Sequence, residues 1–205
     1  TAQRTLKRTT QHGIRHALHP LQRRYRVDHL MLNRRCLNDT FYTDTLFSKV
    51  KSMNGNACAQ VYSNGSFTKV FPMPDKTGAR VGQTLTDFAD DVGIPDTLVM
   101  DLAPEQAGKH TDMQKEARRL RVHIRFTEKG RSEQNHTAEG EIGQLKRRWK
   151  HRMTTKNVPR CLWDYGLVHE AEVLSILARG KDQVPGLEKV LGQTIDISEY
   201  LDFGI

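Results

Sequence analysis

The sequence predicts an α/β fold, a mixed five-stranded sheet with flanking helices, on three observations. Residues 41–50, 57–62 and 67–73 are strand-like, and two Asn-Gly pairs separate them as in antiparallel hairpins. Helix-like and strand-like segments then alternate up to residue 126. A long amphipathic helix follows. Strands that alternate with helices favour a sheet that is parallel in part and covered by those helices.

Positive charge is concentrated at the start of the 205 residues, which carry a formal net charge of +8. Residues 1–40 contain nine lysines or arginines against two aspartates, which is nearly all of the excess. We therefore predict a basic N-terminal arm (1–38), a core (39–180) and a C-terminal tail of the core (181–205). The arm indicates contact with nucleic acid or another polyanion, and a solubilising or targeting tail is the alternative.

The cysteine spacing and the hydropathy indicate the kind of compartment in which the protein works. The three cysteines are widely spaced and form no CxxC pair, which argues against a disulfide framework and favours a reducing compartment. No apolar run reaches membrane-spanning length, so no membrane partner is expected. Because the first residue is not Met, we expect the chain to be a piece of a longer polypeptide.

Histidines in the arm form part of a zinc-ligand pattern. His12 and His16 are four residues apart, and His19, His29 and Cys36 follow. On one helical face the first two would suit zinc, as two ligands of a four-ligand site. A second cysteine is missing from this set, so solvated histidines are the default and zinc is not expected.

Two aspartates occupy positions that favour a function. Asp44 lies inside the first predicted strand, where a carboxylate is disfavoured unless it has a role or faces solvent. Asp101 ends the short apolar run 97–100, at the edge where open α/β sheets place ligands. Segments 110–120 and 121–126 then read as a helix and an edge strand, and residues 162–178 and 187–191 as helices.

The helix predicted over residues 133–150 carries a third carboxylate, Glu139, at the edge of an apolar stripe. At about 100° per residue, Lys146 and Lys150 come round to the same side as Glu139. Glu141 lies about 200° round from Glu139 and is expected to point away. A solvated charged face is the alternative for these side chains. The stripe is formed by Ala138, Ile142, Leu145 and Trp149.

These three carboxylates would meet if the strands of Asp44 and Asp101 are neighbours and the helix of Glu139 crosses their ends. Such oxygen ligands suit hard divalent cations such as Mg²⁺, which keep open positions for water and phosphate oxygens. Two ions of this kind stabilise the attacking and leaving oxygens of a phosphoryl displacement. The sequence therefore predicts a phosphoryl-transfer site.

The same residues carry a resemblance to a known family. Asp44, Asp101 and Glu139, the last two separated by 37 residues, resemble the D,D,E signature of retroviral and retrotransposon integrases. The sequence QNHTAE at 134–139 is similar to the helix entry of copia-type integrases. The close of the copia-type core resembles PGLEKVLG at 185–192, DIS at 196–198 and FG at 203–204. The chain from about residue 39 thus resembles the integrase core of a copia-type LTR retrotransposon Pol polyprotein.

The resemblance implies a ribonuclease H-like fold, two Mg²⁺ or Mn²⁺ ions and two chemical steps. Water attacks the 3′ end of the element's DNA copy, and the freed 3′-OH then attacks host DNA. Asp44, Asp101 and Glu139 would be the catalytic residues and metal ligands. A homo-oligomer on two DNA ends, in the nucleus and in cytoplasmic virus-like particles, is also implied. Predicted DNA contacts are Lys146, Lys150, Arg147, Arg131, Arg23 and Arg24.

Two other functions fit these residues. A decayed or domesticated core would bind DNA through its basic arm without any chemistry. A different ribonuclease H-like nuclease would hydrolyse nucleic acid without strand transfer. Metal-dependent nicking separates both enzymes from the relic, and joining of a 3′-OH end to a target separates the integrase from the nuclease.

Overall fold

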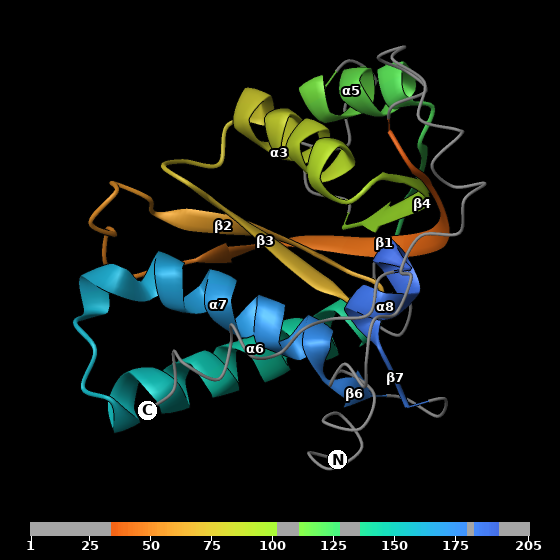
Figure 1. The fold of residues 1–205 in the computed structure, drawn as a ribbon. Coiled ribbons are helices and arrows are strands. Elements are labelled where there is room, and N and C mark those ends of the chain that lie inside the picture. Colours follow the sequence, from red (N-terminus) through yellow and green to blue (C-terminus); the bar gives the residue numbers. More distant parts are fainter. Residues whose placement is uncertain (1–33, 102–110, 128–135, 180–182, 193–205) are drawn as a thin grey trace.

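A central sheet lies between two layers of helices in the computed structural model, which describes residues 34–101, 111–127, 136–179 and 183–192 (Figure 1). The strands are β1 (Cys36–Phe47), β2 (Cys58–Ser63), β3 (Thr68–Met73), β4 (Ile94–Met100), β5 (His123–Phe126), β6 (Ala178–Arg179) and β7 (Val184–Pro185). The helices are α3 (Gly78–Asp91), α5 (Asp112–Leu120), α6 (His136–Thr155), α7 (Trp163–Ile176) and α8 (Gly186–Leu191), with a 3₁₀ turn at Arg160–Leu162. None of the helices within these ranges has the length and hydropathy needed to span a bilayer.

The sheet has the strand order β3-β2-β1-β4-β5. The first three strands are antiparallel neighbours, and β4 and β5 join β1 in parallel. The two hairpin turns hold Gly55 and Gly65 at φ of 82° and 85°, a left-handed conformation that glycine adopts without strain. The predicted mixed five-stranded sheet, its antiparallel meander and its edge strand β5 are therefore confirmed.

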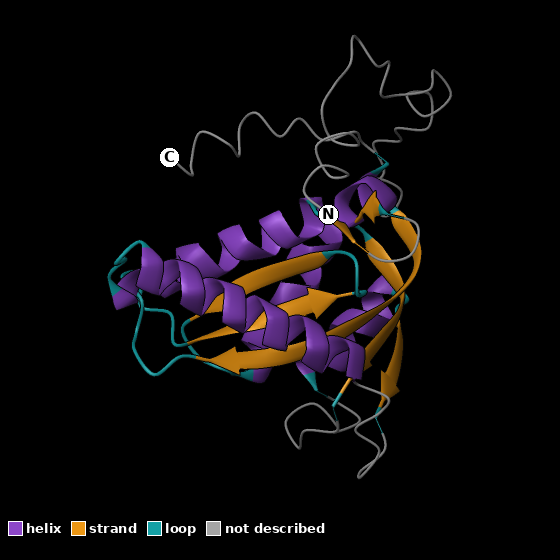
Figure 2. Ribbon diagram, turned by 90° about the horizontal axis from the view of Figure 1, so that it is seen from below, coloured by secondary structure: helices purple, strands orange, loops and turns teal. Residues whose placement is uncertain are grey.

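The two faces of the sheet are covered by different helices. Figure 1 shows α3 and α5 on one face and α6 and α7 on the other, and Figure 2 shows the second pair from below. The core on the α3 side combines aliphatic side chains with aromatic rings that contact one another, with centroids 5.0 Å apart for Phe41 and Phe88. On the α6 side, Leu46 packs with Ile142 and Leu145. Because side chains alternate along a strand, β1 supplies residues to both cores.

Strand β1 begins inside the predicted basic arm. The predicted core starts at residue 39 and its first strand at residue 41, whereas β1 starts at Cys36, which pairs with Ile94 of β4. Leu37 is buried in the core on the α3 side. The local sequence, which mixes Arg, Cys and Asn, hides this start because the pairing partner lies far along the chain. The last residues of the predicted arm are therefore part of the sheet.

The remaining elements follow the predictions with shifted ends. Helix α6 runs from His136 to Thr155, beyond the predicted end at residue 150. Ile142 and Leu145 are buried and Trp149 packs beside them, which confirms these members of the apolar stripe. Helix α7 ends before the predicted residue 178 because the chain turns into the β6–β7 ribbon. Two-residue strands carry no periodicity, so the sequence did not predict this ribbon.

Only one of the predicted zinc candidates lies within the described residues. His12, His16, His19 and His29 lie outside them. Cys36 is described, and it is an exposed free cysteine at the start of β1.

Candidate active site

Asp44 lies in β1, and Asp101 directly follows the parallel neighbour β4, at a neighbouring position. In the register of β1 and β4, Thr43 pairs with Met100, so the next residue along each strand is one of the two aspartates. Side chains at paired positions of parallel neighbours leave the sheet on the same face. The sheet therefore brings two of the three predicted catalytic residues together, at the carboxyl end of β4.

Hydrogen bonds fix both carboxylates. The backbone N–H of Thr45 donates to Oδ1 of Asp44 at 2.7 Å. The buried Thr127, directly after β5, donates its hydroxyl to Oδ1 of Asp101 at 2.7 Å. The backbone N–H of Thr127 in turn donates to the carbonyl of Met100 at 3.1 Å. Asp101 is thus exposed but oriented by a residue that the neighbouring strand holds in place.

The surroundings of Asp44 leave its negative charge only partly offset. Burial raises the pKa of Asp44 above its ordinary value, and the nearby charge of Asp101 raises it further. The hydrogen bond from Thr45 and the cations Lys76 and Lys146 lower the pKa, but the net direction is upward. A further cation at this point would stabilise the ionised form of Asp44.

Helix α6 brings its lysines toward this point. Lys146 is close enough to Asp44 for its positive charge to lower the pKa of Asp44, although burial and the other neighbours have larger effects on that pKa. Glu139 is exposed and lies seven residues before Lys146, on the same side of the helix. Among the described residues, no group of three or more His, Cys, Asp or Glu side chains gathers closely enough to hold a metal ion. The three-carboxylate site therefore stays a prediction, with Asp44 and Asp101 adjacent and Glu139 separate from them.

The adjacent aspartates fit a divalent cation chemically. Mg²⁺ is commonly held through one or two carboxylates, with waters and substrate phosphates completing its shell. The pKa of Asp44 is raised first by burial and also by the neighbouring charge of Asp101, so a bound cation would favour its ionised form. Carboxylate oxygens suit Mg²⁺ and Mn²⁺ rather than zinc.

A groove of about 510 Å³ lies beside this point. Four cations line it, and none of the described residues that line it is acidic. Phe47 is 64% exposed at its edge, with the ammonium of Lys76 5.7 Å from the ring centroid. Cations around an apolar, aromatic surface are typical of sites that bind nucleic-acid strands. The groove is lined by Leu46, Phe47, Ser48, Lys49, Val50, Lys146, Trp149, Lys150, Met153, Thr154, Arg160, Trp163 and Leu167.

Comparison with known proteins finds solved structures that share this arrangement of strands and helices. No family model matches the chain, and no curated protein matches it. The catalytic core domain of BIV integrase is similar in structure, with a TM-score of 0.59 and 12% identity over 81% of this chain and 99% of that domain. The chain has the fold of a retroviral integrase catalytic core.

A second structure agrees with this integrase-core fold. A chain in the structure of the simian T-cell lymphotropic virus intasome matches with a TM-score of 0.61 and 15% identity. The match covers 74% of the present chain and 53% of the viral chain, so the present chain spans about half of that protein's length. At these identities the likeness concerns the fold, and the predicted ribonuclease H-like fold class is confirmed.

Three of the six predicted DNA contacts lie within the described residues. Lys146 and Lys150 line the groove beside Asp44. Arg147 is exposed on the same helix. The other predicted contacts, Arg131, Arg23 and Arg24, lie outside the described residues.

Glu141 is engaged elsewhere, as its position on the helix predicted. Its carboxylate accepts from Nη1 of Arg179 at 2.8 Å and 3.0 Å. Arg179 also donates to the carbonyl of Ser66 at 3.0 Å. Glu141 therefore joins α6 to the β6–β7 ribbon and is not a substitute for Glu139.

Sequence reasoning missed a second charged cluster, centred on Glu170 of α7. Glu170 lies next to Ala171 and three residues after Leu167, both of which are buried, and its own exposure is 1%. Two arginines of α6 pair with it. A carboxylate at the buried spacing of a helix is the signal that could have revealed this cluster.

Proposed function

We propose that this chain is the catalytic core of a copia-type retrotransposon integrase, which processes the 3′ ends of the element's DNA and joins them to host DNA. The observation that carries the proposal is the parallel register that sets Asp44 beside Asp101 within an integrase-core fold. Paired carboxylates on neighbouring strands are suited to phosphoryl transfer. The copia-type origin rests on the sequence resemblance at 134–139 and 185–204.

The proposed roles follow from position for Asp44 and Asp101, and from the sequence resemblance for Glu139. Asp44, Asp101 and Glu139 would hold Mg²⁺ or Mn²⁺. A pair of such ions, when bound, would stabilise the attacking and leaving oxygens of an in-line displacement. Thr127 keeps Asp101 oriented through the hydroxyl bond of 2.7 Å. Lys146, which lines the groove and lies near Asp44, would contact a phosphate of the bound strand.

Both reactions exchange one phosphodiester oxygen for another. In end processing, a water oxygen bonds to the scissile phosphorus and the bond from phosphorus to the 3′ oxygen breaks, which leaves a free 3′-OH. In joining, that 3′-OH oxygen bonds to a phosphorus of host DNA and the host 3′ oxygen departs. One site can serve both steps because the leaving and attacking groups are of the same kind.

The groove beside Asp44 is the proposed path of the DNA end. Lys146 and Lys150 would grip its phosphates, and Phe47 and Trp149 offer apolar surface to a base or sugar. We also propose a homo-oligomer that holds two DNA ends, and activity in the nucleus and in cytoplasmic virus-like particles.

The test is a strand-transfer assay on the purified chain with labelled DNA ends and Mg²⁺ or Mn²⁺. Asp44→Asn, Asp101→Asn and Glu139→Gln are each expected to lower joining by more than about 100-fold, because each removes a metal ligand. Asp96→Asn is the matched control, since Asp96 is exposed at the opposite end of β4. Joining that survives in Asp44→Asn and Asp101→Asn would contradict the proposal.

One observation favours a second candidate, a DNA-binding relic. Among the described residues, no set of three carboxylate, His or Cys ligands gathers at one point. A relic would bind the labelled DNA but neither nick nor join it with either metal. A nuclease of the same fold would nick the DNA without joining, so the two readouts of one assay separate the three functions.

A further inference from the structure

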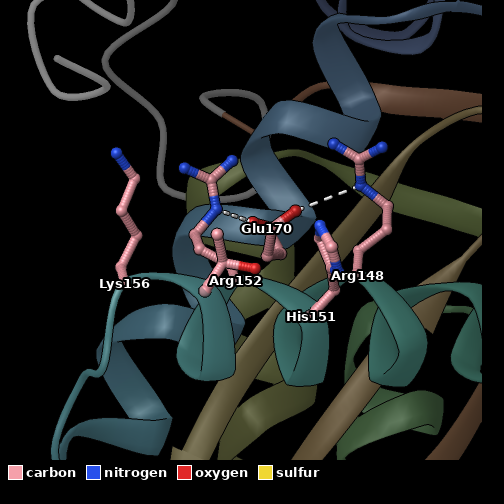
Figure 3. A pocket seen from close by; sticks show the side chains of 6 residues that line it. Arg148, His151, Arg152, Lys156 and Glu170 are labelled. Carbon is pink, nitrogen blue, oxygen red and sulfur yellow. Dashed lines mark hydrogen bonds and ion pairs between the residues drawn. The ribbon is translucent and has the colours of Figure 1, made fainter.

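Helix α6 carries a second basic surface that faces away from Glu139. Arg148 and Arg152 lie about 180° and 220° round the helix from Glu139, whereas Lys146 and Lys150 lie close beneath it. The two arginines line a pocket of about 250 Å³ with His151, Thr155, Lys156 and Glu170 (Figure 3). This pocket shares no lining residue with the groove beside Asp44.

Glu170 holds both arginines through the same guanidinium atom, Nε. Arg148 donates from Nε to Oε2 of Glu170 at 3.1 Å, and Arg152 donates from Nε to Oε1. Figure 3 shows the guanidinium groups on either side of Glu170, with their terminal nitrogens directed away from it. Within the described part of the chain, these terminal nitrogens have no hydrogen-bond acceptor. Each arginine therefore keeps four of its five N–H donors for a ligand.

The charge and geometry of the pocket suit phosphate. Arg148, Arg152 and Lys156 supply three basic side chains against the single carboxylate of Glu170. The side chains of the two arginines are about one-third exposed, at 35% and 34%, so a ligand can reach them. A guanidinium fixed through Nε presents its planar fork in one orientation, which matches two oxygens of a phosphate.

The spacing of the cations favours a polymer of phosphates over a single one. Positions 148, 152 and 156 follow one another every four residues, which is a rise of about 6 Å per step and about 12 Å in all. A nucleic-acid strand places one phosphate per roughly 3.4 Å of duplex axis, so the row spans several phosphates.

We propose that Arg148, Arg152 and Lys156 bind the backbone of a DNA segment distinct from the strand in the groove beside Asp44, and that Glu170 is the positioning residue of this site. The inference rests on the proposed function, because it assigns the second surface to the same nucleic-acid substrate class. One helix then contacts DNA on two opposite faces, with Lys146 and Lys150 on the first and the arginine pair on the second.

The test measures binding of a labelled DNA duplex by fluorescence anisotropy over a salt series, in EDTA so that chemistry is absent. The variant Arg148→Gln/Arg152→Gln is expected to lower the slope of log K against log salt by about 0.9 for each phosphate that it no longer neutralises, hence by nearly two. Arg118→Gln/Arg119→Gln is the matched control. It removes the same charge from exposed positions of α5, on the other face of the sheet.

The role of Glu170 has an independent readout. Loss of a carboxylate near DNA should tighten binding if only net charge matters. If Glu170 positions the arginines, Glu170→Gln weakens binding although it removes negative charge. A folded Glu170→Gln protein that binds DNA as tightly as the parent, or more tightly, overturns the positioning role, and a thermal melt shows whether the variant is folded.

The outcomes also separate this inference from the proposed function. If the parent chain does not bind the duplex, the proposed function fails with the inference. If the parent binds and the arginine variant keeps the slope of its control, only the inference fails. Tripolyphosphate is the competing probe. If the variant loses tripolyphosphate binding but keeps its DNA slope, a free polyphosphate is the ligand and the DNA assignment is wrong.

Discussion

Asp44 and Glu170 are carboxylates inside the same fold, and they differ in how far their neighbours compensate the negative charge. Burial raises the pKa of Asp44, and so does Asp101, with incomplete compensation from Thr45 and two lysines. Glu170 is more deeply buried, yet two arginines donate to it. A carboxylate whose ionised form is only partly compensated, such as Asp44, marks a place for a cation, whereas a fully paired carboxylate orients the groups around it.

Glu170→Gln has the largest expected effect on stability and tests the second half of this contrast. The substitution replaces two charge-assisted hydrogen bonds at a buried position, so we expect a loss of about 2 kcal/mol or more in the free energy of unfolding. Urea denaturation measures it. Glu172→Gln on the same helix is the control, and equal midpoints for the two variants would show that Glu170 is not a structural anchor.

Added Mg²⁺ tests the first half of this contrast, the proposed cation site at Asp44 and Asp101. If Asp44 and Asp101 hold the ion as proposed, a concentration ten times its Kd stabilises the folded chain by about 1.4 kcal/mol. Thermal melts with and without Mg²⁺ measure this shift. Asp96→Asn should keep the shift and Asp44→Asn should lose it. A shift that persists in Asp44→Asn would mean that the ion binds elsewhere.

Helix α6 contributes side chains to the region of Asp44 and to the region of Glu170. A substitution that contacts neither region can raise the stability of this helix. A Cβ added at Gly143 would meet no atom within 4 Å, whereas one at Gly166 of α7 would lie 3.1 Å from Trp149. Gly143→Ala should therefore stabilise the protein by about 0.5–1 kcal/mol. Gly166→Ala is the contrasting control. Denaturation midpoints measure both, and a destabilised Gly143→Ala protein would indicate a contact that α6 makes there.

The pH dependence of Asp44 is the smallest expected effect, because Thr45 and two lysines offset part of its cost. The folded state raises the pKa of Asp44, chiefly through burial, so the folded chain binds this proton more tightly than the unfolded chain. Ionisation therefore costs stability as the pH rises above the ordinary pKa of about 3.9.

Asp44→Asn removes that cost, which gives the sign of the test. Without divalent metal, the variant should melt at a higher temperature than the parent at neutral pH, and the two should converge near pH 3. Melting curves at several pH values measure the difference. A gap that widens as the pH falls would contradict a raised pKa for Asp44.

Local sequence predicted much of the fold because the signals are local. The Asn-Gly pairs gave the meander, since Gly55 and Gly65 take the left-handed conformation that such turns need. The apolar spacing gave the buried face of α6, where Ile142 and Leu145 meet the sheet. The start of β1 at Cys36 was missed because it depends on pairing with Ile94, a partner distant in the chain.

The candidate site divides in the same way. Residue type and spacing predicted a site of Asp44, Asp101 and Glu139, which stays a prediction for Glu139. The helical period predicted that Glu141 points away from Glu139, and its hydrogen bond from Arg179 confirms this. The tertiary structure alone decided that Thr43 pairs with Met100, which sets the two aspartates side by side.

Tertiary structure also decided that Glu170 meets arginines 18 and 22 residues earlier in the chain. Hydrophobic periodicity and turn residues are encoded within a few residues of sequence, so the sequence by itself determined the elements and the faces they bury. Which charged groups meet depends on how those elements pack, and that is the physical reason why the compensation of each carboxylate emerged only from the fold.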